Sequence, residues 1–112
     1  MSHAQAERTP TVADIILSQL GGRRFLVMTG AKDLAGDNTM LSMKLPANMT
    51  KGRASHCRIT LEPTDTYKVE TLKVKRTSDY AMEAVVIDSA DMVYSNQLQG
   101  VFTRLTGLDT HL

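Results

Sequence analysis

The sequence predicts an α+β domain, in which a five-stranded, mostly antiparallel meander carries an N-terminal and a C-terminal helix packed on one face. Two observations predict it. Apolar residues recur at helical spacing near both ends of the chain, and strand-length segments joined by short turns lie between them. The expected order is α-β-β-β-β-β-α. We expect residues 1–8 to form a flexible tail and residues 9–112 a single domain.

The first predicted helix begins at Thr9-Pro10, with Thr9 as N-cap and Pro10 at the first helical position. Apolar residues follow at helical spacing from Val12 to Leu20. Gly21-Gly22 then ends the helix, because glycine adopts the left-handed C′ conformation without a Cβ penalty.

The first strand is predicted from Arg24 to Thr29, where the apolar run is continuous rather than alternating. Such a run is typical of a strand that is covered on both faces. Gly30 interrupts it, and residues 32–38 are rich in turn formers and predict a loop.

Three further strands are predicted at residues 40–45, 55–62 and 67–76, with a hairpin connection at Pro63-Thr64-Asp65-Thr66. In the last of these strands Val69 and Leu72 fall on opposite parities. A bulge near Glu70-Thr71 would return both to the core face.

A fifth strand is predicted from Tyr80 to Ile87. Apolar residues then recur at helical spacing from Tyr94 to Leu105, which predicts a C-terminal helix of about four turns. Asp88 and Asp91 are its candidate capping residues, and Gly107 is its C′ glycine.

Composition and charge favour a reduced, cytoplasmic protein. The chain carries 42% apolar residues, a net charge of +1 and the single cysteine Cys57, so bulk charge and disulfides indicate neither a strongly basic nucleic-acid binder nor an oxidising compartment. The polar N-terminus lacks the apolar region of a signal peptide, and no window approaches the ~18 apolar residues of a membrane span.

Gly30-Ala31-Lys32 invites comparison with a phosphate-binding loop, so one alternative is a small nucleotide-binding or enzymatic domain that uses this segment. A P-loop requires G-x-x-x-x-G-K-[ST] followed by a helix. Here the upstream glycine is missing, Asp33 stands where the hydroxyl residue belongs, and a loop is predicted to follow. A strand end that needs a glycine turn explains the segment better.

No constellation of residues predicts catalysis or metal binding. His3, His56 and His111 are scattered, and adjacent residues of a strand, such as His56 and Cys57, point to opposite faces. Zinc would require three or four converging ligands. We therefore predict no catalytic, cofactor-binding or metal-binding residues and favour a protein that is not an enzyme.

Positive charge is concentrated between Lys51 and Arg76. If the hairpin pairs as predicted, Arg58, Lys73 and Lys75 share the solvent face of the sheet. A solvated face has the same composition, because exposed lysines discourage edge pairing. The alternative is a phosphate-contacting surface, whose candidate nucleic-acid-binding residues are Arg53, Arg58, Lys73, Lys75 and Arg76.

A resemblance to a known family rests on the blocks 25–32, 41–46, 58–61, 65–69, 93–102 and 106–108. Through them the chain resembles small conserved proteins of bacteriophages and integrated mobile elements, a family of uncharacterised function. The resemblance covers most of residues 13–112 and implies a phage or prophage origin and a compact fold. Thr29, Gly30 and Lys32 belong to its leading block and carry no assigned role. Family members often end in aromatic-Thr-Ser-Leu, whereas this chain ends in Asp109-Thr110-His111-Leu112.

The favoured function is therefore that of a non-enzymatic phage or mobile-element accessory protein that binds another macromolecule. Its expected partner is a host or phage protein, without membrane association. A homodimer is expected if the helix-free face of the sheet is partly apolar. Nucleic-acid binding through the basic sheet face is the main alternative.

Overall fold

The computed structural model describes residues 11–76 and 81–110. It confirms an α+β fold built on an antiparallel sheet of five strands in the order β1-β2-β3-β4-β5. The strands are β1 (Lys32–Gly36), β2 (Met40–Lys44), β3 (His56–Leu61), β4 (Tyr67–Arg76) and β5 (Met82–Val93). The helices are α1 (Val12–Leu20), α2 (Arg23–Thr29) and α3 (Leu98–Thr106), with 3-10 turns η1 (Lys51–Arg53) and η2 (Ser95–Gln97).

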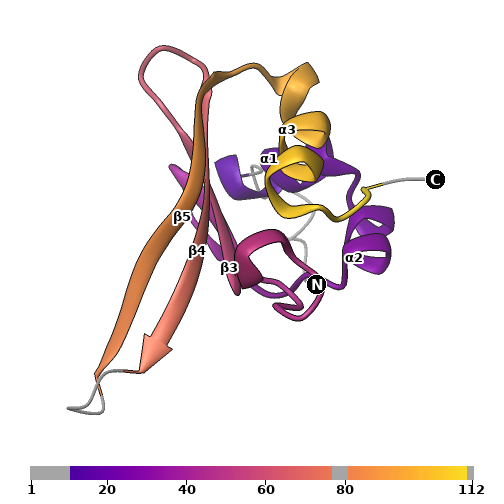
Figure 1. Ribbon diagram of the computed structural model, residues 1–112. Helices are drawn as coiled ribbons and strands as arrows, with labels where there is room; N and C mark the ends of the chain where they lie inside the picture. The colour runs from indigo at the N-terminus through magenta and orange to yellow at the C-terminus, as the bar shows by residue number, and fades with distance from the viewer. Residues whose placement is uncertain (1–10, 77–80, 111–112) are drawn as a thin grey trace, which may run out of the picture.

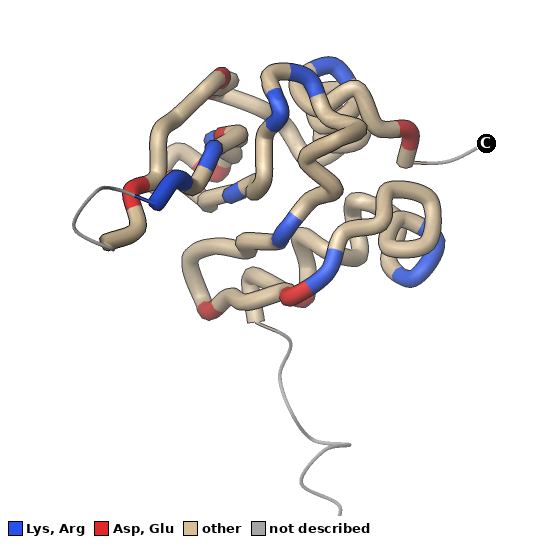
Figure 2. The backbone as a smooth tube through the Cα atoms, turned by 60° about the horizontal axis from the view of Figure 1, so that its bottom comes forward, with Lys and Arg blue, Asp and Glu red and all other residues tan. Residues whose placement is uncertain are grey.

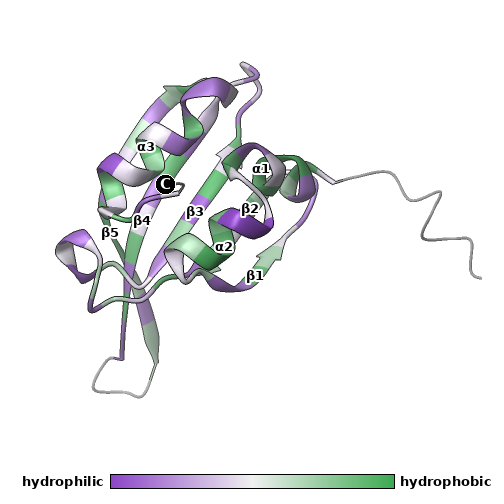
Figure 3. Ribbon diagram, turned by 90° about the vertical axis from the view of Figure 1, so that its right-hand side faces the viewer, coloured by the Kyte–Doolittle hydropathy of each residue, from purple (hydrophilic) through white to green (hydrophobic). Residues whose placement is uncertain are grey.

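The three helices lie on one side of the sheet, which Figure 1 shows from the edge and Figure 3 from the helix side. The core fills the space between these two layers. Strand residues such as Met43, Ile59 and Val69 are buried there against helix residues such as Ile16 and Phe102. The other side of the sheet, which we call the open face, carries no helix in the described part of the chain.

The first helix begins later than the sequence predicted. Thr9 and Pro10, like the predicted tail, lie outside the described residues. In the structure Thr11 is the N-cap: its Oγ1 accepts from the Asp14 N–H at 3.2 Å, and the Asp14 carboxylate accepts from the Thr11 N–H at 3.0 Å. This reciprocal capping box satisfies two amide groups that the helix itself cannot.

The prediction of a strand from Arg24 to Thr29 is wrong, because this segment forms helix α2. Gly21 and Gly22 both have positive φ, which turns the chain sharply enough for a second helix to start at once. Only Phe25 and Thr29, one helical turn apart, are buried, whereas Val27 is 75% exposed. A short apolar run fits the periodicity of a strand or of a helix, and here the packing of Phe25 against α3 favours the helix.

The ring of Phe25 packs edge-on against that of Phe102 in α3, with ring centroids 4.9 Å apart.

The predicted loop at residues 32–38 supplies the first strand instead, β1, which ends at Gly36. The turn that follows is fixed by Asp37, whose carboxylate accepts hydrogen bonds from the backbone N–H groups of Thr39 and Met40. A hydrogen bond from the Thr39 hydroxyl, followed by these two backbone bonds, lowers the pKa of Asp37. Short strands with a turn-rich sequence are easily mistaken for loops.

The irregularity predicted near Glu70-Thr71 exists, but the extra residue belongs to β5. Thr71 is opposite Asp88 and Leu72 is opposite Val86, so Ile87 is the inserted residue. Strand β4 itself runs unbroken against β3 from Tyr67 to Leu72. Leu72 therefore points to the open face, and the prediction that it joins Val69 in the core is wrong.

Strand β5 continues to Val93, well past the predicted end at Ile87. Asp88 and Asp91 consequently lie in the strand and do not cap a helix. The C-terminal helix α3 is shorter than predicted, at nine residues, and η2 precedes it. Gly107 is its left-handed C-cap, as predicted.

Candidate interaction surface on the β4–β5 arm

The most distinctive feature of the molecule is a two-stranded ribbon that projects from the sheet (Figure 1). Strand β3 pairs with β4 only as far as Leu72. Beyond it, β4 and β5 pair with each other alone, from Leu72 opposite Val86 to Arg76 opposite Met82. We call this ribbon, residues 72–76 and 82–86, the arm. A two-stranded hairpin is marginally stable in water by itself, so such an arm requires support at its root or along its length.

The register of the two strands gives the arm one apolar and one charged face. On the first face Leu72 is opposite Val86, Val74 is opposite Ala84, and Arg76 is opposite Met82. We call this the apolar face. The charged face carries the pairs Lys73–Val85 and Lys75–Glu83. Residues directly opposite each other in an antiparallel pair share a face, so this division follows from the register alone.

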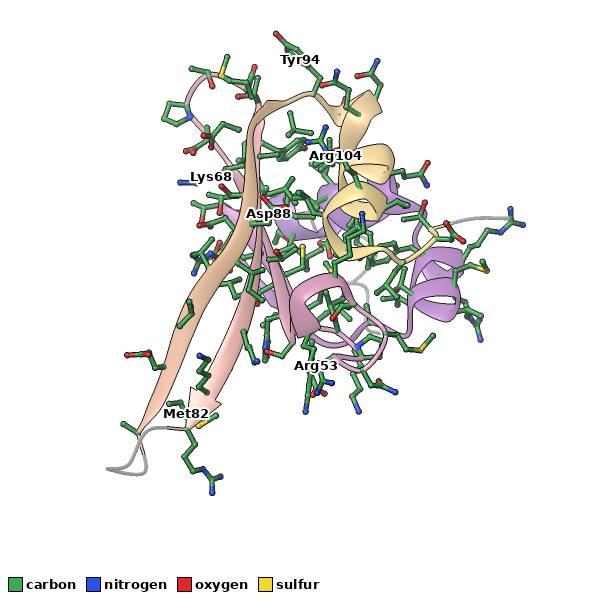
Figure 4. The ribbon with its side chains drawn as sticks, viewed as in Figure 1. Arg53, Lys68, Met82, Asp88, Tyr94 and Arg104 are labelled. Atoms are coloured by element: carbon green, nitrogen blue, oxygen red, sulfur yellow. The ribbon has the colours of Figure 1, made fainter. Side chains whose placement is uncertain are left out.

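The apolar face is largely open to solvent beyond its root. Met82 is 64% exposed and Val86 47% exposed, and Ala84 between them is exposed as well. Figure 4 shows Met82 at the far end of the arm. Leu72 is only 6% exposed although it lies outside the core cluster. Contiguous exposed apolar side chains on a projecting element are typical of interaction sites.

Sequence reasoning missed these residues. The available signal was the unbroken run Ala84-Val85-Val86-Ile87, which leaves an apolar residue on each face of a terminal strand.

The root of the arm is held by Ser55 and by η1. The Ser55 N–H donates to the Leu72 carbonyl at 2.8 Å, and Ser55 Oγ accepts from the Val74 N–H at 2.9 Å. In η1, a Cβ on Gly52 would lie 2.9 Å from Ile87 Cγ2, so this turn rests directly against β5. These contacts brace the root of the arm.

The five predicted nucleic-acid-binding residues do not form one surface. Arg58 lies on the open face, where its Nε and Nη2 are both 3.0 Å from Glu70 Oε1. Lys73 and Lys75 have the opposite parity and lie on the charged face of the arm. The prediction that these three share a face is therefore wrong, because β4 has no bulge between Glu70 and Lys73.

The other two members are also separated. Arg76 belongs by register to the apolar face of the arm, opposite Met82. Arg53 projects into solvent from η1, as Figure 4 shows. The colouring in Figure 2 shows that basic positions continue to the last described residues of β4. Of the predicted set, Lys73 and Lys75 alone share a face of one element.

The Thr29–Lys32 segment ends one element and starts the next. Thr29 Oγ1 donates to the Phe25 carbonyl at 2.8 Å and accepts from the Ala31 N–H at 3.1 Å. Gly30 is the left-handed C-cap of α2, and Lys32 begins β1. A phosphate loop needs a helix after it, whereas here a strand follows.

The same arrangement closes α3, where Thr106 Oγ1 bonds the Phe102 carbonyl and the Leu108 N–H around Gly107.

The described residues offer no assembled catalytic or metal centre. Their His, Cys, Asp and Glu side chains form no group of three or more that could hold a metal ion. Burial raises the pKa of the Cys57 thiol to about 12, so it is not a thiolate at neutral pH. Ser55 Oγ lies 2.9 Å from His56 Nδ1, but the same oxygen is engaged by the Val74 N–H at the arm root.

Comparison with known proteins adds no relative. No protein-family model matches the chain, and neither the curated proteins nor the solved structures give a match. Within residues 11–76 and 81–110, no helix is long and apolar enough to cross a membrane. The fold and the arm are therefore the basis for assigning a function.

Proposed function

We propose that this protein is a non-enzymatic accessory protein of a phage or mobile element that acts in the bacterial cytoplasm by binding another macromolecule through the apolar face of its arm. The observation that carries the proposal is the exposure of Met82, Ala84 and Val86 on one face of a projecting ribbon. Leaving such side chains in water forgoes roughly 25 cal/mol for each Å² of apolar surface that a partner would cover.

A protein partner fits this face better than a nucleic acid does. The body of the open face beside it is polar, and there Arg58 and Glu70 neutralise each other. The apolar face thus has a polar rim on its root side, and a polar rim around an apolar centre is the usual anatomy of a protein interface. Phosphate backbones are instead bound through unpaired basic side chains.

The proposal is tested by capture from lysates of host cells and of infected cells, with and without nuclease. The Val86→Glu variant places a charge at the centre of the apolar face. Val27→Glu on α2 is the matched control, because Val27 is even more exposed but lies elsewhere on the molecule. We expect wild type and the control to retain the same nuclease-resistant protein and Val86→Glu to lose it. Equal capture by all three overturns the proposal.

Nucleic-acid binding is a second candidate function, favoured by Lys73 and Lys75 on the charged face of the arm. Two-stranded ribbons are one of the elements that enter nucleic-acid grooves. The test is the salt dependence of binding to duplex DNA and to single-stranded RNA. If these lysines contact phosphates, Lys73→Gln and Lys75→Gln will each lower the slope of log K against log salt by about 1. Lys68→Gln, on the open face (Figure 4), is the control.

A further inference from the structure

The outer edge of β5 is an unguarded strand edge over residues 82–86. Strand β5 ends the sheet on one side and β1 ends it on the other. Proteins blunt such edges with short strands, prolines, lysines or bulges. Strand β1 has five residues and an irregular register next to Asp33, which has φ +52°. Residues 82–86 of β5 contain no proline, no lysine and no register shift.

We propose that the outer edge of β5 pairs in antiparallel fashion with the same strand of a second copy of this chain, about a two-fold axis at Ala84. This goes beyond the proposed function, since it uses the edge of the arm and not its apolar face. The regular stretch is limited by the bulge at Ile87 on one side and by the last described pair of the arm, Arg76 opposite Met82, on the other. Ala84 is its midpoint, and a two-fold contact must be self-complementary.

The side chains that would meet across this axis are compatible. Met82 would be opposite the partner's Val86, and Ala84 would be opposite the partner's Ala84, so every pair on the apolar face is apolar. On the charged face Glu83 would be opposite the partner's Val85, while its own Lys75 remains beside it. No like charges are directly opposed.

Axis positions shifted toward Ile87 are less favourable because they bring the bulge into the paired stretch. An axis at Val85 would place Met82 opposite the partner's Asp88, on the far side of the bulge at Ile87. An axis at Val86 would place Ala84 opposite that same residue if the bulge were ignored. Both arrangements pair an apolar residue with a carboxylate and interrupt the ladder.

Pairing would join two arms into a four-stranded sheet, a size that is stable where a two-stranded ribbon is marginal. It would also place two apolar faces side by side and so double the surface offered to a partner. Each copy contributes only the five residues 82–86 to the edge contact, far fewer than the roughly 20–30 residues of a standard interface. The association is therefore weak in dilute solution, and its test must trap it.

The test is cross-linking of the full-length Ala84→Cys variant with a short bis-maleimide. The natural chain has one cysteine, Cys57, which is buried and does not compete. Ser89→Cys is the control: Ser89 is exposed on the same strand, but two copies of it would lie roughly 33 Å apart in the proposed pair.

We expect Ala84→Cys to form covalent dimers at least about tenfold faster than Ser89→Cys, because pairing raises the local thiol concentration. Equal rates, or faster linking of Ser89→Cys, overturn the proposal. Should Ala84→Cys fail to fold, sedimentation of the wild type decides, since monomer alone at the highest attainable concentration also overturns it. Capture of a protein partner by a strictly monomeric chain would leave the proposed function intact.

Discussion

Replacing Arg58 is expected to destabilise the fold and to leave partner binding unchanged. The sequence suggests a phosphate contact at this position, but the guanidinium is committed to Glu70, with two nitrogens 3.0 Å from the same carboxylate oxygen. The pair is unequally buried: the side chain of Glu70 is 11% exposed and that of Arg58 is 40% exposed. Removing the arginine leaves a buried carboxylate without its ion-pair partner, whereas removing the glutamate leaves an arginine side chain that solvent can hydrate.

The magnitude follows from this asymmetry. Breaking a fully buried pair costs 3–5 kcal/mol, and an exposed pair contributes less than about 1 kcal/mol. Because water reaches Arg58, we expect Arg58→Leu to lower the free energy of unfolding by about 1.5 kcal/mol and Glu70→Leu by about 0.5 kcal/mol. The double variant should recover most of the loss, since an apolar pair of similar volume replaces an ion pair at little cost.

Urea denaturation at pH 7 measures all three variants against wild type. A loss of 1.5 kcal/mol corresponds to a midpoint shift of roughly 1 M for a domain of this size. A larger loss in Glu70→Leu than in Arg58→Leu would refute the burial argument. Strict additivity in the double variant would refute the pairing itself, because two residues in contact must couple.

Three further predictions concern the caps, the arm root and pH. Gly30→Ala and Gly107→Ala should each cost about 1 kcal/mol by thermal or urea unfolding, since both glycines have left-handed φ; a neutral effect would argue against the caps. Ser55→Ala should accelerate hydrogen exchange of the Val74 N–H without unfolding the core, and unchanged exchange would contradict the bracing role. Burial, aided by Lys44, lowers the pKa of His56 below 6.5. The unfolded chain therefore takes up this proton first, and stability falls as pH drops from 6.5 through the folded pKa. His56→Gln should flatten that decline, which urea midpoints across this range will measure. Asp37 affects stability in a more acidic pH range. Because its pKa is lowered in the folded chain, its contribution to the free energy of unfolding declines only below about pH 3.8.

The fold class and the central strands could be predicted because β2, β3 and β4 alternate apolar and polar residues or end at proline and hairpin signals. Helix α2 could not be predicted by periodicity, because the four-residue apolar run from Phe25 to Met28 fits a strand or a helix equally well. The discriminating signal was a repeat. Phe25 to Gly30 and Phe102 to Gly107 share the pattern F-x-x-x-T-G, and both close a helix with the same threonine and glycine cap.

The candidate site was harder to predict than the fold. Which face a basic residue occupies depends on strand parity, and a bulge assigned to β4 when it belongs to β5 moves Lys73 to the wrong side. The arm arises because β4 and β5 extend beyond the end of β3. No local sequence pattern encodes this difference in strand length. The apolar residues of the arm are therefore exposed to solvent, whereas the same residues in a central strand would be buried in the core.

Hydrogen exchange is the sharpest test of whether the apolar face of the arm is the binding surface. Amide exchange of the full chain is measured free and in the complex isolated from infected-cell lysate. We expect protection to increase at residues 72–76 and 82–86 and to stay unchanged at α2, whose Val27 is more exposed to solvent than Val86. Protection of α2 or α3 with an unprotected arm would contradict the claim.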